Sequence, residues 1–539
     1  MSENHAAMLG ACPSGASTDA LAMRGSYGRA NTLNVRSMIA PAAFRSTVAA
    51  MVRTTLLRRI AAPLMLLGTA MPLGAQQAPT LADKVEAVLA TAPTGTRFGL
   101  VVVGEDGREL VAINPDQRFI PASNTKMFTT ATAFATIAGL DAADPEGGTG
   151  VRLEHNGHGA PDVVIEGRGD ARLSSAPDCK VDCLAVLADA VAAKTRVVGN
   201  VVGDDSWFPD ERWSPGMSWN NIPTRSGTGI SALTLDDNEL AATVMPGALG
   251  MPPRVELPAY YTIENRAVTV AAGETHLGDD RDPNGYVVRL TGTIAAGAKP
   301  EHVRFGIDDP ARYAAWRFRD LLVARGVRVT GTIGVRHRPL LPADDPANRK
   351  GAPAARPPAP EALVRLPLPP LGEDLTIINK VSQNLHAELM LRRIGRLSGS
   401  GSIADGQAAV RAMLAQAGVP RTAFDFADGS GMSSYNRIAP RGTVTMLRWI
   451  ATQPWGAAWR ATLPVGGEGG LARRFGGTAL DHKVFAKTGT LNATNALSGY
   501  LIAKSGRTLT FSILANDVPD GASALAALDK AILTVAAEN

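Results

Sequence analysis

Three short motifs, far apart in the chain, constrain what it can fold into more than any other feature of the sequence. In order, they are Ser123-Asn124-Thr125-Lys126, Ser382-Gln383-Asn384 and Lys487-Thr488-Gly489. The local pattern predicts that the first motif opens a helix, that the second lies on or beside a helix, and that the third lies on a strand. A site made from all three requires a strand from one end of the chain to face a helix from the other end.

The first motif has the spacing that a nucleophile and its base require. Ser-x-x-Lys alone should occur on the order of once by chance in such a chain, and then indicates only an exposed helix start. At a helix start, residues i and i+3 share a face, so Lys126 can reach the Ser123 hydroxyl. A desolvated lysine can lose its proton near neutral pH and act as base. The N–H groups of Ser123 and Thr490 are expected to bind an oxyanion.

The other two motifs supply groups that a peptide substrate needs. Ser382 adds a second hydroxyl that can pass a proton to a leaving amine, and Asn384 can hydrogen-bond a substrate amide. Gly489 has no side chain where a substrate must lie against the strand edge. Lys487 and Thr488 offer a charge and a hydroxyl to a substrate carboxylate. The motifs therefore predict a nucleophilic serine site.

The chain alternates between two kinds of sequence. Residues 76–143 and 372–539 mix amphipathic helices with apolar strands, and we expect them to form one catalytic domain in two parts. Residues 144–337 contain short β-rich runs separated by Gly, Pro, Asn and Asp, which predicts one or two inserted, mostly β domains. Residues 338–371 are rich in Pro, Ala and Arg, which favours an exposed linker.

Hydrophobic periodicity predicts the positions of the elements. A hairpin is expected over residues 97–116, with its turn at Glu105-Asp106-Gly107. The expected helices cover residues 81–90, 123–138, 184–194, 312–325, 375–393, 404–416 and 523–537. The expected strands cover residues 162–166, 197–203, 267–271, 287–294, 484–488, 496–503 and 508–516.

Residues 51–75 have the pattern of a secretory signal peptide. Three arginines precede an apolar stretch over residues 60–73, and the small residues Gly74-Ala75 follow it. The apolar stretch is shorter than the roughly 20 residues that a membrane span needs, and two prolines interrupt it, so no transmembrane anchor is expected. Because such a signal works near an N-terminus, we expect translation to start at Met51 and residues 1–50 to be a non-native or disordered leader.

The cysteines and the net charge narrow the possible classes of protein. Of three cysteines, Cys12 lies in the expected leader, and Cys179 and Cys183 have no His or Cys neighbours to complete a metal site. Export permits a short local disulfide between them, which we favour over two buried thiols. The formal charge of +4 and the lack of basic runs interleaved with aromatic residues do not indicate nucleic-acid binding.

Together with their flanking sequence, the motifs resemble the penicillin-binding serine DD-peptidases. The resemblance is to the soluble D-alanyl-D-alanine carboxypeptidase/endopeptidase group with domains inserted between the first two motifs. Gln383 stands where the wider group has Asp. Two further stretches resemble that group's signatures, Asp428–Pro440 (DGSGMSSYNRIAP) and Leu463–Tyr500. The match is good over residues 81–142 and 372–539, and looser over the insertion.

The resemblance implies a fold and an activity. The implied fold is α/β, a penicillin-binding/β-lactamase-like transpeptidase domain with an antiparallel sheet flanked by helices and with inserted, mostly β domains. The implied activity is hydrolysis of D-alanyl bonds in peptidoglycan stem peptides through a Ser123 acyl-enzyme, with Lys126 as base. β-Lactam antibiotics would then be covalent inhibitors. The resemblance implies no cofactor or metal, and a periplasmic or otherwise extracytoplasmic location.

The resemblance also suggests two outer substrate contacts. Asp204 lies in a family-like stretch, Gly203–Phe208, and could bind the amino group of a diaminopimelyl side chain. An Asp at such a place is also common as a turn residue. Arg437 follows Gly429-Ser430-Gly431 and could meet a substrate carboxylate, although an ion pair with the protein itself is an equal alternative.

Three other classes of protein fit the sequence less well. A Ser-His-Asp hydrolase would need a G-x-S-x-G elbow, and Asp428-Gly429-Ser430-Gly431 is one residue out of that pattern. A β-lactamase core would not hold the long stretch between Ser123 and Ser382. A non-catalytic peptidoglycan-binding module would show a degraded nucleophile or base, whereas Ser123 and Lys126 are both present. The sequence leaves open the choice between carboxypeptidase and endopeptidase action.

We predict that the chain is exported and cleaved after Ala75. Intact-mass measurement on protein from the envelope fraction should give an N-terminus near Gln76, because the small residues before it suit signal peptidase. Mature protein that retains residues 1–50 would contradict both the signal peptide and the start at Met51.

Overall fold

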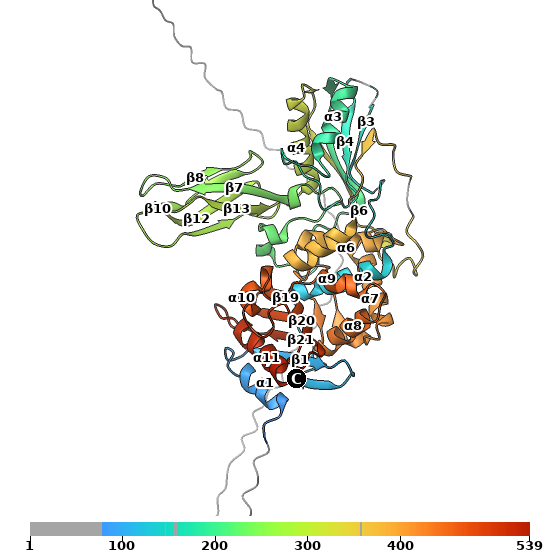
Figure 1. Cartoon of the computed structure of the whole chain (residues 1–539). Coiled ribbons are helices and arrows are strands. Elements are labelled where there is room, and N and C mark those ends of the chain that lie inside the picture. Colours follow the sequence, from blue (N-terminus) through green and yellow to red (C-terminus); the bar gives the residue numbers. More distant parts are fainter. Residues whose placement is uncertain (1–77, 146, 156, 158, 356–357) are drawn as a thin grey trace, which may run out of the picture. The chain divides into compact units, whose positions relative to one another are not determined.

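The central sheet of the computed structural model is assembled from both ends of the chain (Figure 1). The structure describes residues 78–539 apart from 146, 156, 158 and 356–357, so the predicted leader and signal peptide lie outside the described residues. The strand order is β19-β20-β21-β1-β2, with every pair antiparallel. The strands are β1 (Arg97–Val103), β2 (Glu109–Ile113), β19 (Val484–Leu491), β20 (Thr494–Ile502) and β21 (Thr508–Asn516).

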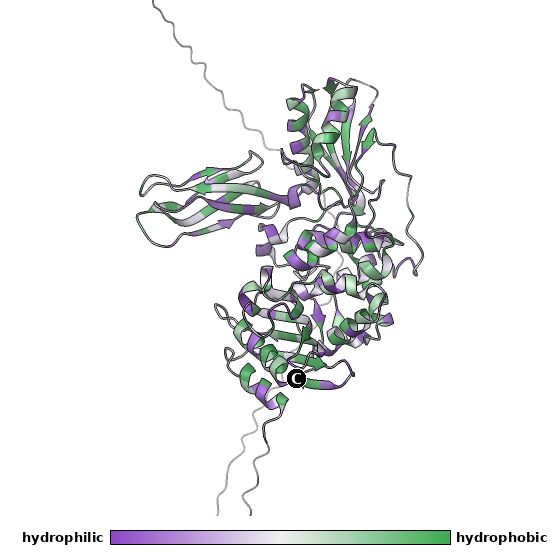
Figure 2. Cartoon of the chain, viewed as in Figure 1, coloured by the Kyte–Doolittle hydropathy of each residue, from purple (hydrophilic) through white to green (hydrophobic). Residues whose placement is uncertain are grey.

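Helices cover both faces of this sheet. Neighbouring residues of a strand point to opposite faces, so Ile513 packs in one core and Leu514 in another. The first core contains residues of α1 (Leu81–Leu89) and α11 (Leu525–Glu538), and the second contains residues of α2 (Thr125–Thr136) and α8 (Pro440–Ala451). Figure 2 shows hydrophobic residues along these strands. The predicted antiparallel sheet flanked by helices is confirmed.

The helix predicted over residues 375–393 is wrong, because the chain breaks at the second motif. Ser382 adopts a left-handed conformation with φ 66°, which ends the π-helical turn η6 (Ile377–Val381). Gln383 then caps the next helix, accepting a hydrogen bond from Leu385 N at 3.1 Å. The helices on either side are α5 (Leu371–Thr376) and α6 (Asn384–Arg396), and those after them are α7 (Ile403–Gln416), α9 (Gly456–Ala461) and α10 (Ala472–Phe475).

The residues between the first two motifs are rich in strands, as predicted. They form a five-stranded sheet (β15-β6-β4-β3-β16), a three-stranded sheet (β13-β7-β8), a four-stranded sheet (β9 to β12) and the pair β14-β5. The helices α3 (Leu184–Lys194) and α4 (Pro310–Ala324) pack against the five-stranded sheet through one apolar core. The strands are β3 (Gly150–Glu154), β4 (Asp162–Glu166), β5 (Val197–Val198), β6 (Val201–Pro209), β7 (Glu239–Met245), β8 (Arg254–Glu256), β9 (Thr262–Asn265), β10 (Val268–Val270), β11 (His276–Asp280), β12 (Val287–Ala295), β13 (Glu301–Gly306), β14 (Arg328–Val329), β15 (Ile333–Arg338) and β16 (Val364–Arg365).

The segment predicted as an exposed linker, residues 338–371, contacts the rest of the chain in places. Its strand β16 pairs with β3, and Arg349 forms an ion pair with Asp405 of α7. The domain boundaries themselves stay a prediction. Cys179 and Cys183 form the local disulfide that we favoured. Within the described part of the chain, every helix is too short or too polar to cross a bilayer.

Candidate active site

Ser123 and Lys126 lie at the entrance to α2. Ser123 sits in the 3-10 turn η1 (Ala122–Asn124), and Lys126 follows in the first helical turn. The Lys126 side chain is fully buried. Its Nζ donates to Ser123 Oγ at 3.0 Å, to Asn384 Oδ1 at 2.6 Å and to Ser430 O at 2.6 Å. The predicted serine and lysine are therefore in direct contact, and the second motif reaches the same amine.

Burial changes the acidity of Lys126. Removal from water disfavours the ammonium form and lowers the pKa of Lys126 to about 7, while the nearby carboxyl groups of Asp428 and Glu388 act in the opposite direction. None of the three acceptors around Nζ is a carboxylate. A substantial fraction of the amine is thus neutral near pH 7 and can take a proton from Ser123.

Lys487 and Ser382 form the opposite wall. Lys487 Nζ donates to Ser382 Oγ at 2.9 Å and to Thr488 O at 3.1 Å, and its side chain is fully buried. Burial, together with the charge of Lys126, lowers the pKa of Lys487 well below its usual value. The left-handed backbone at Ser382 presents this hydroxyl between α6 and β19. The second and third motifs are therefore brought together as the sequence predicted.

Gly489 is where η1 comes closest to β19. A Cβ at Gly489 would lie 2.6 Å from Pro121 O and 3.1 Å from Asn124 Nδ2, so any side chain would push the two elements apart. Asn124 Nδ2 also donates to Lys487 O at 3.0 Å. The glycine thus allows the turn that carries Ser123 to pack on the strand, a role that differs from the substrate clearance expected from the sequence.

The predicted oxyanion position lies on β19, which is the edge strand of its sheet. Toward the start of this edge strand, Ala486 N donates to Pro464 O at 3.0 Å and Val484 O accepts from Gly466 N at 2.9 Å. Backbone groups alternate in direction along a strand, so Thr488 and Thr490 face the same outer edge. Thr490 is exposed. This arrangement is compatible with the oxyanion role predicted for its N–H group.

Sequence reasoning missed Glu388, a buried carboxyl group behind Lys126. Glu388 Oε1 accepts hydrogen bonds from Gly429 N at 3.0 Å and Ser430 N at 2.8 Å. Burial is the main reason that the pKa of Glu388 rises to about 7. It thereby holds the turn whose carbonyl, Ser430 O, contacts Lys126. Its position four residues after Asn384, on the same helix face, was the available signal.

Asp428 organises the rest of this turn. Its carboxylate accepts from Gly431 N at 2.8 Å, Ser433 N at 2.6 Å and Asn436 Nδ2 at 2.6 Å. Gly431 has φ 93°, and a Cβ there would lie 1.9 Å from Ala122 O, so the turn packs directly behind Ser123. The family-like stretch that begins at Asp428 therefore shapes the site.

The segment between the first two motifs also contacts the site. Asn384 Nδ2 donates to Ser226 O at 2.9 Å, and Ser433 Oγ donates to Pro215 O at 2.5 Å. His386, two residues after Asn384, lies between Asp237 and Asp374. Burial lowers the pKa of His386, but its hydrogen bonds to the two carboxyl groups and their charges outweigh this effect and raise the pKa to about 9. Because Asp237 lies far from His386 in the sequence, local pattern does not show this pairing.

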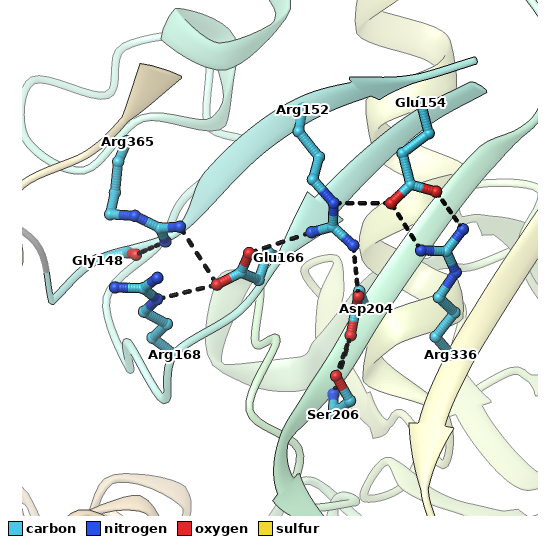
Figure 3. A network of polar contacts seen from close by, with 9 residues as sticks. All are labelled: Gly148, Arg152, Glu154, Glu166, Arg168, Asp204, Ser206, Arg336 and Arg365. Carbon is cyan, nitrogen blue, oxygen red and sulfur yellow. Dashed lines mark hydrogen bonds and ion pairs between the residues drawn. The ribbon is translucent and has the colours of Figure 1, made fainter. Parts of the chain in front are cut away.

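Asp204 lies in a separate polar network on the inserted five-stranded sheet (Figure 3). Its carboxylate accepts from Arg152 Nη2 at 2.9 Å and from Ser206 Oγ at 2.6 Å. Arg152 also pairs with Glu154 and Glu166. A buried carboxylate needs a counter-charge, and Arg152 supplies it. Among the described residues, the contacts of Asp204 do not join it to the three motifs, and its binding of a substrate amine stays a prediction.

Arg437 braces its own loop. It begins β18 (Arg437–Ile438), and its Nη1 donates to Ser434 O at 2.5 Å and to Asn436 O at 2.8 Å. Burial and the charges of Arg118 and Arg97 lower its pKa. The sequence left two alternatives open for Arg437, a substrate carboxylate and an ion pair with the protein itself. Among the described residues, Arg437 forms no ion pair with a carboxylate and makes no hydrogen bond to Ser123. A substrate role for Arg437 therefore stays a prediction.

Over the residues that the structure describes, no group of three His, Cys, Asp or Glu side chains is arranged to hold a metal ion.

Known proteins match this chain along most of its length. The family model of the D-Ala-D-Ala carboxypeptidase 3 (S13) family matches residues 81–538. The D-alanyl-D-alanine carboxypeptidase of Actinomadura sp. (strain R39) is 34% identical over 463 residues, which cover 81% of each chain. The D-alanyl-D-alanine carboxypeptidase DacB of Haemophilus influenzae is 24% identical over 80% of this chain and 87% of its own.

A solved structure matches the fold as well. The crystal structure of penicillin binding protein 4 (dacB) from Haemophilus influenzae aligns with a TM-score of 0.69 and 20% identity, covering 83% of this chain and 98% of that chain. The fold implied by the motifs is therefore confirmed. The chain belongs to the D-Ala-D-Ala carboxypeptidase 3 (S13) family and is a serine-type D-Ala-D-Ala carboxypeptidase.

Proposed function

We propose that Ser123 is the nucleophile that cleaves D-alanyl peptide bonds in peptidoglycan stem peptides. One observation carries this assignment: Lys126 Nζ lies 3.0 Å from Ser123 Oγ, and the pKa of Lys126 is about 7. The neutral amine takes the Ser123 proton as Oγ attacks the D-alanyl carbonyl carbon. The tetrahedral oxyanion then accepts hydrogen bonds from the N–H groups of Ser123 and Thr490.

Collapse of this intermediate releases the amine of the C-terminal D-alanine and leaves an ester on Ser123. The leaving nitrogen needs a proton, which Lys126 returns directly or Ser382 relays, since Ser382 Oγ contacts Lys487 Nζ at 2.9 Å. Water then attacks the ester, with Lys126 again as base. Asn384 holds the Lys126 amine through Oδ1 at 2.6 Å. Lys487 and Thr488 would bind the substrate carboxylate.

The same site serves two reactions. Carboxypeptidase action removes a terminal D-alanine, and endopeptidase action cuts a cross-link, but both present a D-alanyl carbonyl to Ser123. We propose that the chain performs the first and has capacity for the second. β-Lactams would acylate Ser123, as their strained amide presents a comparable carbonyl. The signal-like segment over residues 51–75 supports a periplasmic or otherwise extracytoplasmic location.

Labelled penicillin tests the nucleophile directly. The protein should form a stable one-to-one adduct, and peptide mapping should place the label on Ser123. Ser123→Ala should abolish the adduct and D-alanine release while leaving the thermal transition nearly unchanged, since the hydroxyl contributes little to packing. A variant that keeps most of the activity would exclude Ser123 and make Ser430 the next candidate.

The acylation rate should depend on pH through Lys126. The base must be neutral, so the rate should rise with pH and reach half its plateau near pH 7. Charge on Glu388 raises the pKa of Lys126, so Glu388→Gln should move this midpoint to lower pH. Stopped-flow acylation between pH 5 and 9 measures it. If the midpoint does not move in Glu388→Gln, the carboxyl group of Glu388 does not affect the pKa of Lys126.

Lys487 should act on the charge of the substrate. In the free enzyme burial lowers the pKa of Lys487 well below its usual value, and a substrate carboxylate beside it would favour the charged ammonium again. Loss of that charge-assisted hydrogen bond in a dry cleft costs roughly 1.5–3 kcal/mol, so Lys487→Ala should slow acylation by about 10- to 150-fold. The loss should be larger for a peptide with a free C-terminal carboxylate than for its amide. Lys126→Ala is the matched control, because loss of the base affects both peptides alike. If Lys487→Ala slows acylation equally for the acid and the amide peptide, Lys487 does not bind the substrate carboxylate. Thr488 or Arg437 then becomes the candidate for that role.

A further inference from the structure

A second cavity, of about 630 Å³, lies between helices α8 and α9 and the strands β19 to β21. None of its lining residues belongs to the three motifs. Two arginines line it, Arg448 of α8 and Arg460 of α9, together with Phe485 of β19 and Tyr500 of β20. The cavity is therefore a separate hollow in this part of the chain, lined mainly by α8 and α9, with Phe485 as its one contribution from the edge strand β19.

Arg460 presents a guanidinium without an anionic partner. Its Cζ lies 4.1 Å from the centre of the Phe485 ring and 5.4 Å from that of Tyr500. Partial burial lowers its pKa, and the opposing effect comes from Tyr500 alone. Over the described residues, no Asp or Glu forms an ion pair with it. An arginine has five N–H donors, and stacking on rings satisfies none of them.

Arg448 adds a second positive charge to the cavity. Its Nη1 donates to the backbone carbonyl Gly104 O at 2.6 Å, which offers no full negative charge. The one acidic side chain that lines the cavity, Glu105, accepts a hydrogen bond from Thr508 N at 2.7 Å. By contrast Arg441, on the same helix as Arg448, pairs with both Glu109 and Asp116. The lining thus carries a net positive charge with unused donors.

The walls indicate what else a ligand must carry. Phe485 and three small side chains, Ala451, Ala457 and Ala461, give the cavity an apolar surface. A bare inorganic anion would leave this surface in contact with water, whereas a peptide with small methyl side chains would cover it. Carboxylates on such a peptide could receive two-pronged hydrogen bonds from the guanidinium groups.

We infer that this cavity is a second binding site for a carboxylate-bearing stem peptide of peptidoglycan. This inference rests on the proposed function for one point only, that the polymer is peptidoglycan. A stem peptide carries several carboxylates and small alanyl side chains, which match the two arginines and the apolar walls. On a polymer with many such peptides, a second site holds the enzyme near its next substrate by raising the effective concentration.

The test uses full-length protein already acylated by penicillin, so that the catalytic cleft is closed. The probe is a stem tetrapeptide ending in a single D-alanine, measured by isothermal titration calorimetry, with adduct mass checked before and after. The acylated protein should bind one peptide. Arg460→Gln and Arg448→Gln should each weaken binding about tenfold or more, because each loses a charge-assisted hydrogen bond. Amidation of the peptide's carboxylates should weaken binding similarly.

Arg441→Gln is the matched control, because its arginine lies on α8 but pairs with protein carboxylates; its affinity should be unchanged. Penicillin acylation rates of the variants check that they are folded. Failure of penicillin to label the protein would count against the proposed function. Failure of the acylated protein to bind the peptide, unchanged affinity in Arg460→Gln, or equally tight binding of inorganic phosphate would each overturn this inference.

Discussion

The burial of Lys126 among neutral acceptors is the constraint on which the rest of the site depends. An amine in water stays protonated at neutral pH, and a carboxylate partner would hold the proton more firmly still. Here the three partners of Nζ are a hydroxyl, an amide oxygen and a backbone carbonyl, contributed by Ser123, Asn384 and Ser430. Desolvation therefore dominates and lowers the pKa of Lys126, which is what the proposed role of a base requires. The carboxyl groups of Glu388 and Asp428 stand one layer further back, where they shape the turn and moderate the effect.

This burial requires elements from both ends of the chain. The helix α2 supplies the serine and lysine, α6 supplies the amide, and β19 closes the wall with a second buried lysine, Lys487. The five-stranded sheet makes the arrangement possible, because β1 pairs with β21 and so fixes the first and last parts of the chain to each other. The contact of η1 with β19 tolerates no side chain at Gly489. Carbonyls of the insertion, Ser226 O and Pro215 O, also bond to side chains of the site.

Local pattern predicted most elements but not the breaks and partners that tertiary packing imposes. Residues 375–393 are amphipathic enough for one helix, and nothing local shows that Ser382 must turn left-handed to point its hydroxyl at Lys487. Asp204 stands in a family-like stretch, yet its partner is Arg152, on a strand far away in the sequence. Glu388 was missed for a related reason: its partners, the N–H groups of Gly429 and Ser430, lie in a distant turn.

The sequence by itself determined the chemistry available: a serine and lysine one helical turn apart, a second serine with its asparagine, and a Lys-Thr-Gly strand, in that order along the chain. These follow from residue type and short spacing, which the covalent chain fixes. The tertiary structure decided the state of that chemistry. Whether Lys126 is a base, whether Gly489 serves packing, and whether Arg460 is left without a carboxylate depend on solvent exclusion and on neighbours brought from elsewhere in the chain. Desolvation and charge pairing are properties of the assembled interior, and short sequence patterns do not encode them.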